Sequence, residues 1–182
     1  MSLLQTVITA VGNKCTELGL KVSWSKTKHL HFTPNTAGKV VIMQNKNIES
    51  TRQYKNLGVF QDDKLKFKQQ MKHIGAKVDK RIRVMRFLAY TGLGLNTQLL
   101  TTFYKVAIRS ILEYGSMTFM HSPSALLFLQ RKQNQALRII AKCPTTMSSD
   151  ILHFDLNITP IKILTYIHNL PLSKKSGYFL AI

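Results

Sequence analysis

The sequence predicts an α+β protein, with a small antiparallel sheet and one helix followed by a mostly α-helical region. Three observations support this class. The first sixty residues contain one segment with helical spacing of its apolar residues and several with the alternation typical of strands. After residue 63 the spacing becomes helical and stays so. An apolar content of 45% is enough for a core and argues against disorder.

The region before residue 63 is expected to hold one helix and four strands. Residues 3–18 repeat apolar side chains every three or four positions, and Gly19 follows as a stop signal. Strands are predicted at residues 20–23, 28–33, 39–43 and 54–60, which alternate or are rich in β-branched residues. Residues 34–38 contain Pro and Gly and predict a turn. The pair Asp62-Asp63 is expected to close the fourth strand with another turn.

A long helix is predicted to start near residue 65. Its apolar residues recur at three- and four-residue steps: Phe67, Met71, Ile74, Val78, Ile82, Met85 and Leu88. At about 100° per residue, a row of basic residues lies beside this stripe: Lys68, Lys72, Lys80, Arg83 and Arg86. The helix therefore has one face for a core and one for phosphates.

The rest of the chain is predicted to be helical as well. Residues 92–96 interrupt the long helix, and a second helix is expected at residues 99–120. A third is expected to begin at Ser122-Pro123 and to end near residue 142. Shorter helices are expected to start near Ser148 or Ser149 and at Thr159-Pro160. The change of period divides the chain into residues 1–63 and 64–182.

The charge of the chain points to a polyanionic partner. Its 182 residues include 26 Lys and Arg against 8 Asp and Glu, a formal charge of +18. Because the basic residues are spread along the chain, nucleic acid is favoured over an anionic membrane.

Cys15 and Cys143 form no Cys-x-x-Cys pair, which argues against a disulfide framework or a zinc site. No signal peptide or transmembrane run is visible, so an intracellular location, nuclear or cytoplasmic, is expected.

Several short segments, taken in order, carry a family resemblance. They are Gly19-Leu20-Lys21-Val22-Ser23-Trp24-Ser25-Lys26-Thr27-Lys28, Tyr54-Lys55-Asn56-Leu57-Gly58-Val59, Ile111-Leu112-Glu113-Tyr114-Gly115, Asn134-Gln135-Ala136-Leu137-Arg138 and Ile158-Thr159-Pro160. This order resembles the end of the palm and the thumb of a reverse transcriptase from a non-LTR retrotransposon of the jockey or R1-like kind. The resemblance implies that residues 1–63 are the C-terminal end of the palm, with a palm-like sheet. Residues 64–182 are then the helical thumb and the region that follows it.

The resemblance also implies roles for individual residues. Lys26 matches a lysine that lies near the phosphates of the incoming nucleotide, although Ser23 and Trp24 replace the family's usual Asn-Pro. The alternative is that Lys26 and Lys28 are merely exposed turn lysines. The second segment matches the primer grip, which holds the 3′ end of the growing strand, and its site residues are Tyr54, Leu57, Gly58 and Val59. An ordinary edge strand with a bulge glycine is the alternative.

Other polar residues are weaker candidates. Asp62-Asp63 superficially copies the aromatic-x-Asp-Asp of a polymerase, but no third carboxylate is near in sequence and no metal site is predicted. His29 and His31 share a strand face without a third ligand, so solvent-facing strand residues are the better interpretation. Glu113 follows Arg109 by four residues, which predicts a structural ion pair rather than catalysis.

The leading hypothesis is a fragment of an RNA-directed DNA polymerase that grips primer and template but lacks the catalytic Asp pair. The family's Tyr/Phe-Ala-Asp-Asp segment has no counterpart upstream in this sequence. The expected partners are an RNA or DNA template–primer and the remainder of the palm, not a membrane. No cofactor is expected for the fragment, whereas Mg²⁺ is implied for the parent polymerase. Polymerase activity of the isolated chain is predicted to be absent, and Mg²⁺-dependent primer extension would contradict this.

Two alternatives come from other classes. The chain could be a non-enzymatic, basic nucleic-acid-binding module, either a remnant or repurposed. It could also be a helical protein-interaction domain, which needs an exposed apolar groove.

Overall fold

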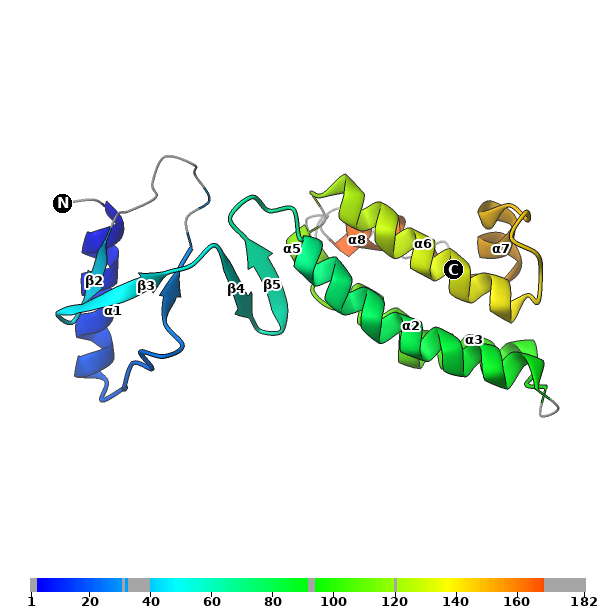
Figure 1. Cartoon of the computed structure of the whole chain (residues 1–182), viewed down its shortest axis with the longest axis horizontal. Helices are drawn as coiled ribbons and strands as arrows, with labels where there is room; N and C mark the ends of the chain where they lie inside the picture. The colour runs from blue at the N-terminus through cyan, green and yellow to red at the C-terminus, as the bar shows by residue number, and fades with distance from the viewer. Residues whose placement is uncertain (1–2, 31, 33–39, 92–93, 120, 169–182) are drawn as a thin grey trace. The chain divides into compact units, whose positions relative to one another are not determined.

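Two compact units make up the chain, Met1–Lys66 and Phe67–Ile182. The computed structural model describes residues 3–30, 32, 40–91, 94–119 and 121–168. Helices and strands are both present, the helices mostly in the second unit (Figure 1). The predicted α+β class is confirmed. Within the described residues, no helix combines the length and apolar character needed to cross a membrane.

The first unit packs one helix against a three-stranded sheet. Helix α1 (Leu3–Glu17) contacts strand β2 (Val41–Met43), and the Gln5 side chain bonds both backbone groups of Ile42. Strand β3 (Lys46–Ser50) pairs antiparallel with β2 and parallel with β1 (Lys28–His29). The small core contains the following buried and half-buried residues: Val41, Met43, Ile48, Ile8, Val22 and Trp24.

A separate hairpin ends the first unit. Strands β4 (Gln53–Asn56) and β5 (Val59–Asp62) pair antiparallel, with Asn56 opposite Val59. The sequence predicted a single strand over residues 54–60, and this is wrong. Both Leu57 (φ 45°) and Gly58 (φ 85°) have left-handed backbone conformations, which a tight two-residue hairpin turn requires. The chain therefore reverses where a continuous strand was expected.

Other strand predictions in the first unit also need correction. Residues 20–23 form no strand, because the chain turns after α1 and Leu20 remains 60% exposed instead of facing a core. Strand β3 was not predicted, since Ile48 is its one buried residue and the apolar signal is weak. Of the strand predicted at residues 28–33, Lys28–His29 forms β1, residues 30 and 32 are not in a strand, and residues 31 and 33 lie outside the described residues. The turn predicted at residues 34–38 also lies outside them.

The long helix α2 (Lys68–Tyr90) confirms the predicted helical period. Six of its predicted apolar positions are buried: Phe67, Met71, Ile74, Val78, Ile82 and Met85. These side chains belong to one core with residues of α6 (Pro123–Ile140), which lies beside α2 (Figure 1). Helix α6 starts with Pro123 at its first position, as predicted, and ends at Ile140 before Lys142 takes a left-handed conformation (φ 49°).

Shorter helices complete the second unit. The predicted helix at residues 99–120 is divided into α3 (Thr97–Phe103), a π-helical segment η2 (Tyr104–Arg109), α4 (Ser110–Glu113) and α5 (Ser116–Phe119). The break before α5 occurs at Gly115, whose φ of 69° ends the helix. Helices α7 (Ser149–Asp155) and α8 (Ile161–His168) begin where predicted. The side chain of Ser148 caps α7 by accepting from the Asp150 amide at 3.3 Å.

Candidate nucleic-acid interface

The basic row predicted for α2 is exposed along its whole length. Lys68, Lys72, Lys80, Arg83 and Arg86 all lie on the surface of the second unit. The helix also exposes Lys77 and Arg81, which lie on α2 outside the predicted row. In total α2 carries seven Lys and Arg residues and one carboxylate. This helix is therefore a strongly positive surface element.

The one carboxylate of α2 is neutralised by its neighbouring helix. Asp79 Oδ1 lies 2.6 Å from Lys132 Nζ of α6, and this ammonium also sits 5.6 Å from the centre of the Phe128 ring. Asp79 falls among the basic row on the helix surface, where a free carboxylate would repel a phosphate. Because Lys132 pairs with it, the basic row keeps its positive potential.

The spacing of the row suits an extended polyanion. Lys68 and Arg86 are eighteen positions apart, which corresponds to about 27 Å along a helix axis. That length equals about eight base steps of a nucleic-acid duplex. Lysine and arginine at such positions contact phosphates and carry no sequence information by themselves. The arrangement can therefore bind a nucleic-acid backbone independently of its sequence.

In the first unit, the structure brings together two candidates that are distant in sequence. The hydroxyl group of Tyr54, on β4, donates a hydrogen bond of 2.7 Å to the backbone carbonyl of Lys26. Lys26 itself ends a tight turn, with its amide 3.1 Å from the carbonyl of Ser23. The Lys26 side chain is exposed. The hairpin therefore fixes the turn that presents this ammonium group.

The next lysine is used differently. Lys28 Nζ forms an ion pair with Glu49 Oε2 across the paired strands β1 and β3. Beside it, the Nδ1 atom of His29 lies 3.1 Å from the carbonyl of Ile48. His31 is outside the described residues. Lys28 and His29 thus have structural partners in the sheet, which leaves Lys26 as the better placed cation of this segment.

The hairpin turn places its residues in contrasting environments. Leu57 is 84% exposed at the tip, whereas Val59 is buried at 5%. A non-glycine residue with positive φ costs conformational energy, and an exposed leucine gains nothing from burial. Leu57 is therefore strained and unburied within this unit, while Val59 anchors the hairpin.

The pair Asp62-Asp63 is built into a turn. The Asp62 carboxylate accepts hydrogen bonds from the amides of Lys64, at 3.2 Å, and Lys66, at 3.0 Å. This use agrees with the predicted turn. Across the described ranges, no three His, Cys, Asp or Glu side chains come together as a possible metal site. The carboxylates described here thus do not fit the Mg²⁺ site that a polymerase needs.

One curated protein gives the decisive comparison. Over 163 residues the chain is 26% identical to a protein of Drosophila melanogaster described as a probable RNA-directed DNA polymerase from transposon BS. The chain is similar to a transposon reverse transcriptase. The resemblance seen in the sequence is thereby confirmed. The alignment covers 87% of this chain but 18% of the relative, so the chain spans less than a fifth of that protein's length. No family model and no solved structure matches it.

Two of the segments that resemble a reverse transcriptase meet in a buried polar network between α6, α7 and α8. The side-chain amide of Gln133 donates to the Tyr104 hydroxyl at 2.9 Å and to the Thr159 carbonyl at 3.0 Å. Its oxygen accepts from the Ile161 amide at 2.7 Å. Gln133 is fully buried. A single side chain thus ties α6 to η2 and to the start of α8.

A second part of the network holds α7. The ring of His153 donates from Nδ1 to the Ile158 carbonyl, at 2.7 Å, which leaves Nε2 to accept from Gln130 at 3.0 Å. Gln130 also donates to Asn134 Oδ1 at 2.8 Å. These hydrogen bonds hold α7 against α6.

The predicted ion pair between Arg109 and Glu113 is confirmed, with 2.5 Å between Nε and Oε1. It links η2 to α4.

The buried tyrosine of this network makes the stability of the second unit sensitive to alkaline pH. Burial raises the pKa of Tyr104 from 10.0 to about 12, and the bond from Gln133 opposes this only in part. The folded state therefore holds the proton more tightly than the unfolded state. The contribution of the Tyr104 phenol to the free energy of unfolding is fully present below pH 10. It falls by roughly 3 kcal/mol as the pH rises to about 12.

Urea unfolding across this pH range checks the expectation. Between pH 10 and about 12, the free energy of unfolding should fall by roughly 3 kcal/mol less in Tyr104→Phe than in the wild type, because phenylalanine has no phenol to ionise. Tyr90→Phe, whose ring is 59% exposed, should follow the wild type. Parallel pH curves for the wild type and Tyr104→Phe would show that this phenol does not control the alkaline transition.

Proposed function

We propose that this chain is the palm end and thumb of a non-LTR retrotransposon reverse transcriptase, and that it grips template–primer nucleic acid. Residues 1–63 form the palm end, and residues 64–182 form the thumb with the region C-terminal to it. One observation carries the proposal: an exposed row of five cations on α2, beside the stripe of this helix that is buried in a core. The similarity to a transposon polymerase supports the same assignment.

In this proposal the hairpin and Lys26 face the reacting end of the primer. Leu57 and Gly58 form the exposed tip, and Tyr54 fixes the turn that carries Lys26. Strain at an exposed residue is often retained where a partner contacts it. Leu57 therefore contacts either the primer or the remainder of the palm. Lys26 supplies positive charge near the departing pyrophosphate.

The catalytic carboxylates and their Mg²⁺ belong to the part of the parent polymerase that this chain does not contribute. The described carboxylates take structural roles instead, such as Asp62 in its turn and Asp79 in its ion pair. The remainder of the palm is accordingly the protein partner of this chain.

The salt dependence of binding to duplex DNA tests the gripping function. With five phosphate contacts, log K should fall against log salt with a slope near −4.5, and near −3.5 on single strands. Between about 50 and 200 mM salt this slope lowers duplex affinity roughly 500-fold. Fluorescence anisotropy with a labelled duplex measures it. A flat salt dependence would overturn the proposal.

A non-enzymatic binding module would show the same slope. Sequencing the 5′ end of the transcript distinguishes the two functions. A reading frame that runs upstream into an aromatic-Ala-Asp-Asp segment supports the polymerase. A transcript that begins at Met1 supports the module.

A further inference from the structure

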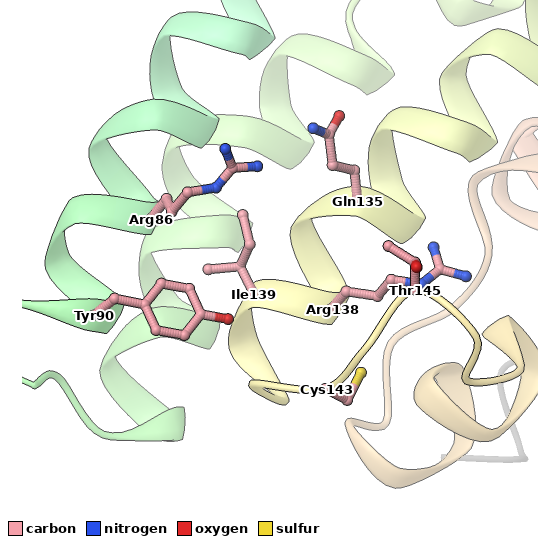
Figure 2. A pocket seen from close by; sticks show the side chains of 7 residues that line it. All are labelled: Arg86, Tyr90, Gln135, Arg138, Ile139, Cys143 and Thr145. Atoms are coloured by element: carbon pink, nitrogen blue, oxygen red, sulfur yellow. The ribbon is translucent and has the colours of Figure 1, made fainter.

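A pocket of about 260 Å³ opens between the C-terminal parts of α2 and α6 (Figure 2). Arg86 and Tyr90 line it from α2, Arg138 and Ile139 from α6, and Cys143 from the segment after α6. We call this the α2–α6 pocket. Arg86 belongs to both this pocket and the basic row, so a strand bound along the row reaches the pocket directly.

The pocket is rich in unpaired positive charge. Among the described residues, neither Arg86 nor Arg138 forms an ion pair with a carboxylate. Arg138 donates from one terminal nitrogen to the Met147 carbonyl at 3.3 Å, while its Nε is buried without a hydrogen-bond partner in the described part of the chain. Guanidinium groups that no carboxylate neutralises bind phosphate strongly, often through two bonds. The chemistry of the pocket therefore selects an anion.

An aromatic side chain completes the pocket. The Tyr90 ring is 59% exposed, and Figure 2 shows its hydroxyl end directed toward Ile139, with Arg86 on the same helix above it. An exposed aromatic ring beside cations is a platform on which bases of an unpaired strand stack. The volume lies just below the 300–1,000 Å³ typical of sites for whole small molecules, so it suits a single base.

We propose that the α2–α6 pocket binds one unpaired nucleotide of the strand that α2 contacts. Its flanking phosphates lie on Arg86 and Arg138, and its base packs against Tyr90 and Ile139. This inference rests on the proposed function, since it assigns the basic row and the pocket to the same nucleic acid. It adds a preference for a junction between duplex and single strand over a blunt duplex.

Binding to two matched DNA probes tests the preference. One is a blunt duplex, and the other is the same duplex with a short unpaired extension. The wild type should bind the extended probe about tenfold more tightly, because one stacked base contributes on that scale. Tyr90→Ala should abolish this preference and leave blunt-duplex binding unchanged. Phe87→Ala is the matched control, since Phe87 is 62% exposed on the same helix and does not line the pocket.

The two arginines of α6 provide a second comparison. Arg138→Gln should lower the preference for the extended probe, whereas Arg131→Gln, an exposed residue outside the pocket, should keep it. A preference that survives Tyr90→Ala overturns the proposal, whatever Arg138→Gln does to folding. A chain that binds neither probe contradicts the proposed function itself, so the two failures are distinct.

Alkylation of Cys143 gives an independent readout on the unmodified chain. Cys143 lines the pocket and is partly exposed, while Cys15 lies in the other unit. The extended probe should slow alkylation of Cys143 several-fold, and the blunt duplex should not, since a base in the pocket blocks access to the thiol. Cys15 reports any general effect of DNA binding. Equal protection of Cys143 by both probes would contradict the proposal.

Discussion

Replacing Gln133 with leucine is expected to lower the free energy of unfolding of the second unit by about 3 kcal/mol. Leucine keeps most of the side-chain volume, so the loss comes from hydrogen bonds rather than from a cavity. Four groups then lose a hydrogen bond to Gln133: the Tyr104 hydroxyl, the Thr159 carbonyl, the Ile161 amide and the side-chain amide of Gln130. Each buried polar group left without a partner costs about 1–3 kcal/mol. Urea unfolding of the full chain, followed by circular dichroism, measures the change.

A matched control isolates the role of the network. Gln69 is exposed on α2, so Gln69→Leu should change the stability by less than about 0.5 kcal/mol. Hydrogen exchange gives a local test, because the Ile161 amide donates to Gln133 and should exchange faster in Gln133→Leu. If the two variants are equally stable, the network does not hold α8 on α6.

This network also shows what the sequence could not provide. Gln133 is one of many glutamines, and its partners come from two other segments: Tyr104 from η2, and Thr159 and Ile161 from the start of α8. No local spacing relates such positions. The α2–α6 pocket has the same origin, since Arg86 and Arg138 line one pocket only after two helices pack. By contrast, the Arg109–Glu113 pair was predictable because both residues lie four positions apart on one helical stretch.

Helix α2 was predictable for a physical reason. Its buried positions follow the helical period without interruption over six turns, and the basic row follows from the same geometry. Strand β3 gave no such signal, because its pairing with both β1 and β2 satisfies the backbone while Ile48 alone is buried. The turn at Leu57-Gly58 was missed because leucine is an unusual residue for a positive φ.

Removing two cations from the basic row of α2 is expected to weaken duplex binding about sixtyfold at 0.1 M salt. In Lys72→Gln/Arg83→Gln, two phosphate contacts are lost, and each contributes about 0.9 to the slope of log K against log salt. The slope should therefore become shallower by about 1.8. Glutamine matches lysine and arginine in helix propensity, so α2 should keep its stability. Anisotropy titrations over a range of salt concentrations measure both quantities.

A control with the same net charge separates a local interface from a general charge effect. Lys105 on η2 and Arg131 on α6 are also exposed, and both lie outside the basic row. If α2 is the interface, Lys105→Gln/Arg131→Gln should keep the wild-type slope, because counterions are released only where phosphates are contacted. Equal losses in the two double variants would mean that the charge of +18 attracts nucleic acid diffusely. The row on α2 would then not be the grip of a thumb.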